Sequence, residues 1–220
     1  MKIRFALLSA IFSLSLLAQE TPVKNSNDTT IITRHPSGMV KSLIQFRNGQ
    51  KNGISLLVGD NGNVLREENY RKGKFHGAVR TFMMSGNVLV EANYKDGVAH
   101  GLSEKYYESG SIQERSFYVD GIRHGPALWF YQNGSIASEF KYVKGSIEGE
   151  SRTYYLDGAI KGIYLYEDNA RNGIFRGFYE NGKIKEEGEY KDDQKTGRWK
   201  IYDEEGKVIR KERYKKGELR

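Results

Sequence analysis

The sequence predicts an all-β protein, an elongated single-layer antiparallel meander of about eight stacked 24-residue β-hairpin repeats. Three observations predict it. Glycines recur every 24 residues, aromatic and β-branched residues recur in phase with them, and turn dipeptides divide each copy into two short runs. Because no insertion breaks the period, we expect each copy to stack on its neighbours and to bury apolar surface against them.

Three classes of glycine carry the period. The first class is Gly53, Gly77, Gly101, Gly125, Gly149, Gly173 and Gly197. The second class is Gly38, Gly62, Gly86, Gly110, Gly134, Gly158, Gly182 and Gly206. The third class is Gly49, Gly73, Gly97, Gly121, Gly145 and Gly217, with Asn169 and Asp193 at its two remaining places. Asn and Asp tolerate positive φ better than most residues, so they can serve in the same turn.

Each copy holds two runs of about seven residues rich in Tyr, Phe, Val, Ile and Thr, which is typical of a β-hairpin. If Gly110 closes a three-residue loop, Tyr106 stands opposite Ile112; a two-residue loop would place Tyr107 there. We favour the first register because the column of Tyr106 is aromatic in six of seven copies.

In that register Tyr106, Ile112 and Tyr118 share one face of the sheet. The opposite face is expected to carry a glutamate column among lysines and arginines, made of Glu67, Glu91, Glu139 and Glu187. The second connection in each copy, from Asp96 to Gly101, is expected to be a wider loop because it holds two glycines four residues apart.

The chain divides into three segments. Residues 1–19 have a basic start and an apolar run from Phe5 to Leu17, which predicts a cleaved signal peptide; an uncleaved anchor or a buried first strand is the alternative. Residues 20–33 are polar and predict a flexible linker, and the repeat array is expected over 34–220. No cysteine is present, which excludes disulfides and a lipid-modified N-terminal cysteine. We therefore expect an exported protein, periplasmic or secreted, with association to the envelope left open.

Two surfaces are candidate binding sites. Tyrosines that follow the core aromatic column are expected on the opposite face and form a candidate contact strip: Tyr107, Tyr131, Tyr155 and Tyr179. The net charge is +7, and residues 195–220 alone hold ten basic and five acidic residues. The basic end consists of Arg210, Lys211, Arg213, Lys215 and Lys216. It predicts either contact with an anionic surface or a solubilising terminal strand. The sixth copy is irregular, since Ile163 and Leu165 give it an apolar outer strand.

The sequence carries no pattern that predicts catalysis. His76, His100 and His124 repeat every 24 residues, so they should stand roughly 10 Å apart, too far for one metal ion. The glutamate column has the same wide spacing. We expect no enzyme activity, no cofactor, no metal, no small-molecule substrate and no nucleic-acid partner.

The repeated pattern resembles a known family. Tyr94-x-x-Gly97-x-x-His100-Gly101, followed by Tyr106-Tyr107-x-x-Gly110-x-Ile112, is similar to the bacterial variant of the MORN repeat. The resemblance covers about 185 of the 220 residues and implies an elongated sheet used to bind proteins, to self-associate or to lie beside a membrane. Many bacterial members carry an antitoxin label.

The function that we predict is an exported, non-catalytic protein-binding scaffold, whose partner is another protein or a second copy. One alternative is a membrane- or envelope-associated structural element that uses the basic end. A second alternative is an antitoxin-like protein that neutralises a partner protein.

Overall fold

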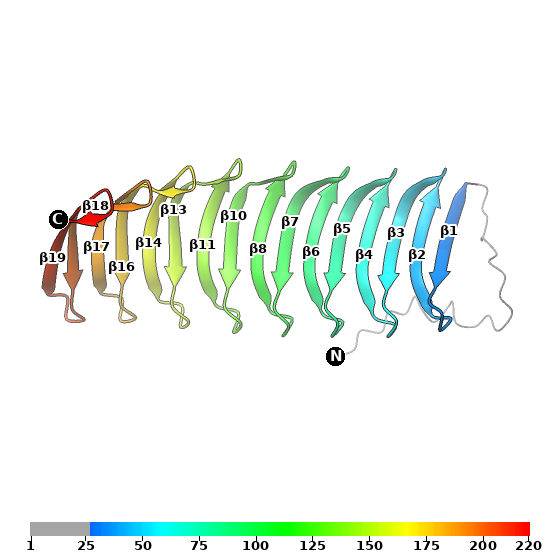
Figure 1. Cartoon of the computed structure of the whole chain (residues 1–220), viewed down its shortest axis with the longest axis horizontal. Coiled ribbons are helices and arrows are strands. Elements are labelled where there is room, and N and C mark those ends of the chain that lie inside the picture. Colours follow the sequence, from blue (N-terminus) through cyan, green and yellow to red (C-terminus); the bar gives the residue numbers. More distant parts are fainter. Residues whose placement is uncertain (1–26) are drawn as a thin grey trace.

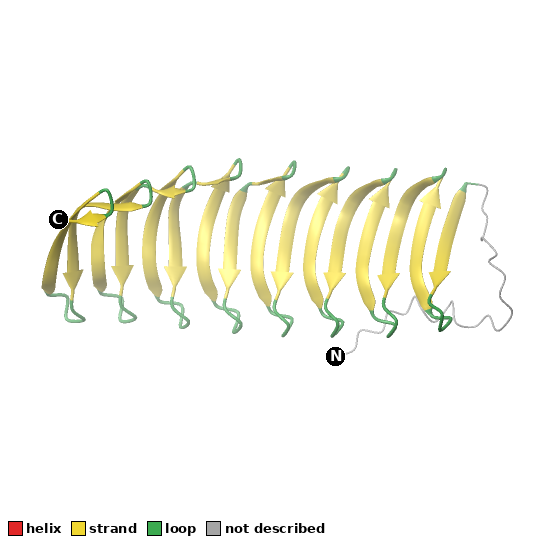
Figure 2. Ribbon diagram, in the orientation of Figure 1, coloured by secondary structure: helices red, strands yellow, loops and turns green. Residues whose placement is uncertain are grey.

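A computed structural model describes residues 27–220, which form one antiparallel sheet of 20 strands with no helix among them (Figure 1). Neighbours in the sequence are neighbours in the sheet, from β1 paired with β2 to β19 paired with β20. Figure 2 shows the resulting single layer of hairpins, with loops along both long edges. The predicted all-β meander of stacked hairpins is confirmed.

The first ten strands are β1 Asp28–Arg34, β2 Val40–Arg47, β3 Gln50–Val58, β4 Val64–Arg71, β5 Lys74–Phe82, β6 Val88–Lys95, β7 Val98–Tyr106, β8 Ile112–Val119, β9 Ile122–Arg123 and β10 Gly125–Phe130. The other ten are β11 Ile136–Val143, β12 Ser146–Ile147, β13 Gly149–Tyr154, β14 Ile160–Glu167, β15 Ala170–Arg171, β16 Gly173–Phe178, β17 Ile184–Lys191, β18 Gln194–Tyr202, β19 Val208–Lys215 and β20 Glu218–Leu219. A two-residue strand such as β9 is the start of a longer strand that is interrupted before the next glycine, so β9 and β10 both pair with β8.

The predicted hairpin register is confirmed. Tyr106 pairs with Ile112, and the N–H of Tyr107 donates to the carbonyl of Ser111 at 2.8 Å. Gly110 has φ 85°, which completes a three-residue loop with a left-handed glycine.

The predicted assignment of faces is wrong. Lys105 pairs with Glu114 whereas Tyr106 pairs with Ile112, so Gln113 is an extra residue in its strand, a β-bulge. This bulge reverses the alternation of side chains, and Tyr118 therefore lies on the face opposite Tyr106. We call the face of Tyr118 the aromatic face. The other, with Tyr106 and the glutamate column, is the charged face.

The second connection is tighter than predicted. Asp96 and Gly97 have φ 51° and 92°, and Lys95 pairs with Val98, which is the geometry of a two-residue type I′ turn. Gly101 is not in the loop; with φ 94° it bends its strand at a second bulge. The first class of glycine thus marks a kink inside every second strand.

The buried residues of the repeats lie on the aromatic face. One column at 24-residue spacing includes Ser55, Val79, Ala127, Ser151, Phe175 and Trp199, each at most 7% exposed. Trp199 is 0% exposed although the sheet has a single layer, because the rings of Phe175, Tyr190 and Tyr214 and the side chain of Lys195 surround it. In its last two copies this column changes from small side chains to large rings.

The array begins earlier than predicted. Residues 28–34 form β1, which pairs with β2 from Asp28 with Arg47 onwards, so six residues assigned to the linker belong to the sheet. The β-branched run Thr29-Thr30-Ile31-Ile32-Thr33 was the signal for it. The predicted signal peptide and residues 20–26 lie outside the described residues. Within residues 27–220, no helix has the length and apolar character that spanning a bilayer requires.

Candidate binding surfaces

The tyrosines of the candidate contact strip lie in a row, as predicted, but their hydroxyls bind the chain itself. Each donates a hydrogen bond of 2.7 Å to a backbone carbonyl in the next copy. The bonds run from Tyr107 to Phe130, Tyr131 to Tyr154, Tyr155 to Phe178 and Tyr179 to Tyr202. The rings are half-buried. The strip therefore joins successive copies, and its role as a contact surface stays a prediction.

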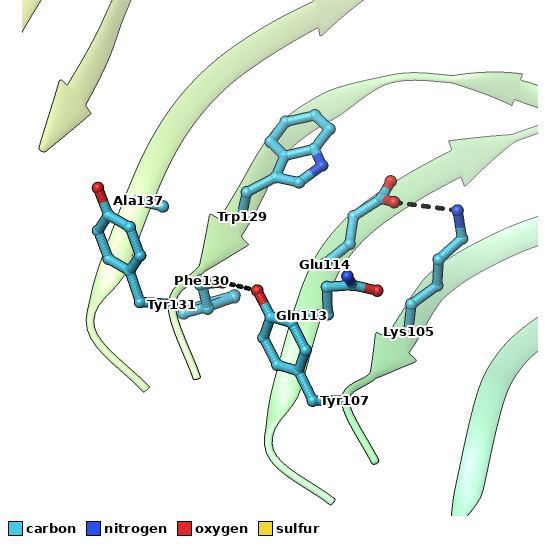
Figure 3. Close-up of a pocket in the computed structure, with 8 residues that line it drawn as sticks. All are labelled: Lys105, Tyr107, Gln113, Glu114, Trp129, Phe130, Tyr131 and Ala137. Carbon is cyan, nitrogen blue, oxygen red and sulfur yellow. Dashed lines mark hydrogen bonds and ion pairs between the residues drawn. The ribbon is translucent and has the colours of Figure 1, made fainter. Parts of the chain in front are cut away.

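A shallow hollow of about 380 Å³ lies beside this strip, between Tyr107 and Tyr131 (Figure 3). Its charged wall is Glu114, 7% exposed, which pairs with Lys105 at 3.2 Å and with Arg123. Because two cations pair with this carboxylate, the role of Glu114 here is a structural ion pair. The hollow contributes apolar area through Trp129 and Phe130.

Cations and rings alternate along the aromatic face. The guanidinium of Arg123 lies 5.8 Å from the ring centre of Tyr118 and 5.4 Å from that of Tyr142. Burial opposes its charge, but the oxygens of Tyr118, Tyr142 and Glu114 around the guanidinium outweigh burial and raise its pKa. Lys195 lies 3.8 Å from the ring centre of Trp199 in the same way. These contacts stabilise cations that are partly withdrawn from water.

The charged face carries a ladder of ion pairs across the strands. Arg80 donates to Glu67 at 3.0 Å and to Glu91 at 2.7 Å, and Arg115 donates to Glu104 at 2.7 Å. Tyrosines of the Tyr106 column join the ladder: the hydroxyl of Tyr202 donates to Glu187 at 2.7 Å. Hydrogen bonds from Tyr202 and Lys200 lower the pKa of Glu187. Most carboxylates of the glutamate column are therefore paired with side chains of the sheet itself.

Two clusters of exposed apolar side chains interrupt the charged face. The central patch consists of Val98, Phe117, Val119 and Ile122, which are 37% to 50% exposed. Val119 pairs with Ile122, so the cluster is continuous from β8 to β9. The sixth-copy patch consists of the exposed residues Ile160, Leu165 and Ile174 together with Ile163, which is half-buried.

The sixth-copy patch follows the irregular strand found in the sequence, whereas the central patch was missed. A signal for it existed. Phe117 and Leu165 are the two apolar residues in a column that otherwise holds Gln45, Asn69, Asn93, Lys141, Glu189 and Arg213. An apolar residue in a polar column of an exposed face marks a candidate contact.

The structure divides the basic end between the two faces. Arg210 lies on the aromatic face and pairs with Glu212 at 2.9 Å, and Lys216 lies in a turn with φ 53°. Lys211, Arg213 and Lys215 share the charged face. There Lys211 stands opposite Lys200, and Arg213 opposite Arg198. Like charges directly opposite each other repel, so this part of the sheet favours an anionic contact.

Two of the three histidines in the column, His76 and His124, support turns. The backbone N–H of Asp96 donates to Nδ1 of His76 at 3.4 Å, and that of Lys144 donates to Nδ1 of His124 at 3.4 Å. Asn52 and Glu148 accept the equivalent bonds in their own copies. Within residues 27–220, no group of three or more His, Asp or Glu side chains is placed to hold a metal ion.

An open sheet of tandem hairpins with two solvent-facing sides defines a class of repeat protein, and the repeat itself is known. The model of the MORN repeat variant matches residues 99–120, 123–144, 147–168, 171–192 and 195–216, which together make up half of the chain. The chain belongs to this family. Its repeats generally bind proteins or membranes.

Solved structures with similar features are distant. A point mutant of S. aureus TarM, in complex with fondaparinux, α-GlcNAc-glycerol and UDP, is 12% identical over 64% of this chain, with a TM-score of 0.29. The TcdB2-TccC3-Cdc42 structure is 13% identical over 87%, and TcdB2-TccC3 is 14% identical over 89%, each with a TM-score of 0.19. The matches cover 21%, 13% and 14% of those chains. Comparison with the curated proteins finds no significant match.

Proposed function

We propose that the chain is an exported, non-catalytic scaffold that binds another protein or a second copy of itself. The observation that carries the proposal is the pair of apolar patches on the charged face. Exposed apolar clusters rimmed by charge gain free energy when a partner covers them. Phe117 is the natural centre of such a contact because aromatic anchors dominate protein interfaces.

The regular stacking of the copies supports this role. Each copy contacts only its neighbours, and every tyrosine of the strip binds the next copy, so the two patches are held at a fixed separation. A partner can therefore engage both patches at once, which raises the affinity without a new contact.

Export is the second part of the proposal. The basic start and the apolar run of residues 1–19 support it. Export would be tested by N-terminal sequencing of the protein from fractionated cells. Cleavage near Gln19 and recovery outside the cytoplasm are expected. An intact N-terminus on a cytoplasmic protein would overturn this part.

The scaffold is tested by crosslinking in intact cells with a C-terminally tagged chain. A patch variant carries Phe117→Thr, Val119→Thr and Ile122→Thr, which keep β-propensity and remove apolar area. The matched control carries Met84→Ser and Leu156→Ser, two exposed apolar residues in turns outside the patches. One defined partner should crosslink to wild type and control but be lost from the patch variant. Equal recovery by all three would contradict the proposal.

A membrane role for the basic end is the second candidate function, favoured by Lys211 and Arg213 standing opposite Lys200 and Arg198. A basic cluster of this kind attracts anionic lipid headgroups. Residues 27–220 should then float with vesicles containing phosphatidylserine at physiological salt, and Lys211→Gln with Arg213→Gln should abolish flotation. Retention of flotation by that variant would remove the basic end from consideration.

A further inference from the structure

The aromatic face repeats one slot. In each copy the residue two places before the first-class glycine lies between two aromatic residues of successive copies, which are tyrosines everywhere except at Phe46. These slot residues are Lys51, Phe75, Ala99, Arg123, Ile147, Arg171 and Lys195. Phe75, for example, has its ring centre 4.9 Å from that of Tyr70 and 5.3 Å from that of Tyr94.

Four of the seven slot residues are basic, and the sheet shows what they do there. Lys51 lies 4.7 Å from the ring centre of Tyr70, and Arg171 lies 4.3 Å from that of Tyr190. Arg123 lies between two tyrosine rings and also donates through Nε to the hydroxyl of Tyr118 at 3.0 Å. The slot thus binds a cation through ring faces and through a phenolic oxygen.

Phe75 and Ile147 place larger apolar side chains in their slots, and Ala99 has the smallest side chain of the seven. It pairs with Tyr94, and its carbonyl accepts from the N–H of Gly121, so its backbone holds the same place as that of Arg123. Its methyl group cannot reach the flanking rings as a longer side chain does. On their far sides Tyr94 contacts Phe75 and Tyr118 contacts Arg123, which leaves the sides towards Ala99 without a ring or cation from a slot residue.

Within residues 27–220, the surroundings of Ala99 do not supply a replacement. The paired residues next in line on this face are Ala92 with Ser103 and Ser103 with Ser116, all of them small. Two basic residues of this face, Lys105 and Arg123, are both engaged by Glu114. The slot at Ala99 therefore has the flanking tyrosines of a cation site without the cation that four of its six sister slots carry.

We propose that Tyr94 and Tyr118 bind a basic side chain, arginine or lysine, of a partner protein in the slot that Ala99 leaves open. The basic group of the partner would occupy the position that the side chains of Arg123 and Lys195 occupy in their own slots. The slot lies on the face opposite the central patch, so it identifies a second contact that is independent of the proposed scaffold surface.

The first test is a titration. Residues 27–220 with labelled tyrosine rings would be titrated with N-acetyl-arginine methylamide, and N-acetyl-citrulline methylamide would serve as the neutral isostere. Saturable shifts of the Tyr94 and Tyr118 ring signals are expected for the arginine compound alone, with weak affinity, on the order of 10 mM for a single side chain. Equal shifts with citrulline, or shifts confined to other tyrosines, would overturn the proposal.

The second test replaces Ala99 by a longer side chain that can occupy the slot. Ala99→Arg should abolish the titration and should unfold at a higher urea concentration than Ala99→Met, which has similar reach but no charge. If Ala99→Met is the more stable variant, the slot is an apolar gap and the proposal is wrong. Neither substitution alters the side chains of the central patch. The crosslinking experiment therefore tests the scaffold, and the titration and urea experiments test the slot, independently of each other.

Discussion

The hydroxyl of Tyr131 donates to the backbone carbonyl of Tyr154, 2.7 Å away in the next copy. The same bond recurs at Tyr107, Tyr155 and Tyr179. Side chains expected to face a partner thus tie each hairpin to the one after it, which makes the strip a source of stability that single substitutions can measure.

Replacing Tyr131 by phenylalanine keeps the ring and removes this bond. We expect the free energy of unfolding to fall by about 1 kcal/mol, because the carbonyl of Tyr154 loses its donor. Urea denaturation measures the change. Tyr179→Phe removes the equivalent bond nearer the C-terminal end and should cost a similar amount. An unchanged midpoint in both variants would show that water replaces the hydroxyl without loss.

Gly188 leaves space for Trp199. A Cβ at Gly188 would overlap the indole, which is 0% exposed and cannot move into free space. Gly188→Ala should therefore destabilise the chain by about 1–3 kcal/mol through overpacking. In a Trp199→Phe background the same substitution should cost less, because the smaller ring leaves room. Equal costs in the two backgrounds would show that the indole is not the obstacle.

Gly125 tests the kink inside the strand. Its φ is 96°, and a Cβ would meet nothing closer than Phe117 at 3.9 Å, so any cost comes from the backbone. Gly125→Ala should lose about 1–2 kcal/mol. Gly125→Asn should lose less, since asparagine tolerates positive φ more readily. The order of the two urea midpoints is the readout, and the reverse order would argue for a steric cause.

Alkaline pH should weaken the sheet. Burial raises the pKa of Tyr164, Tyr166 and Tyr190 on the aromatic face, and burial together with Glu104 raises that of Tyr106. A tyrosine whose folded pKa exceeds its unfolded value of about 10 contributes stability that is complete below pH 10. That stability is lost as pH rises towards the folded pKa. Urea midpoints should fall as pH rises from about 10 towards about 12.

The control for the alkaline prediction is Tyr164→Phe, which cannot ionise. Its urea midpoint should change less with pH than that of the wild type, because one of the groups that bind protons more tightly in the folded state is gone. A midpoint independent of pH in the wild type would mean that the rings ionise without opening the sheet.

The sequence predicted the repeat, the strands and one register, because glycines and tyrosines at a period of 24 leave few alternatives. Gly110 and the aromatic column of Tyr106 together were enough to place Tyr106 opposite Ile112. The bulge at Gln113 could not be predicted in the same way, since its column holds Leu65, Leu89, Ala137, Lys161, Lys185 and Ile209 and no turn residue. One unmarked extra residue therefore reversed the faces.

The candidate sites were harder to predict because they depend on distances between copies. Whether Tyr107 faces solvent or the carbonyl of Phe130 depends on how closely successive copies approach each other. The basic end was predicted as one cluster, but neighbouring strand residues point to opposite faces, which separates Arg210 from Lys211.

The uneven core gives the array a direction. Phe175 and Trp199 pack with Tyr164, Tyr190 and Tyr214, whereas the same column nearer the N-terminus holds serine, valine and alanine. A ribosome makes the weaker copies first, and neighbour contacts alone hold them together. We therefore expect much of the folding free energy to become available only when Trp199 has been synthesised. Until then the nascent chain should unfold more readily than the finished array, which eases its threading through a narrow channel.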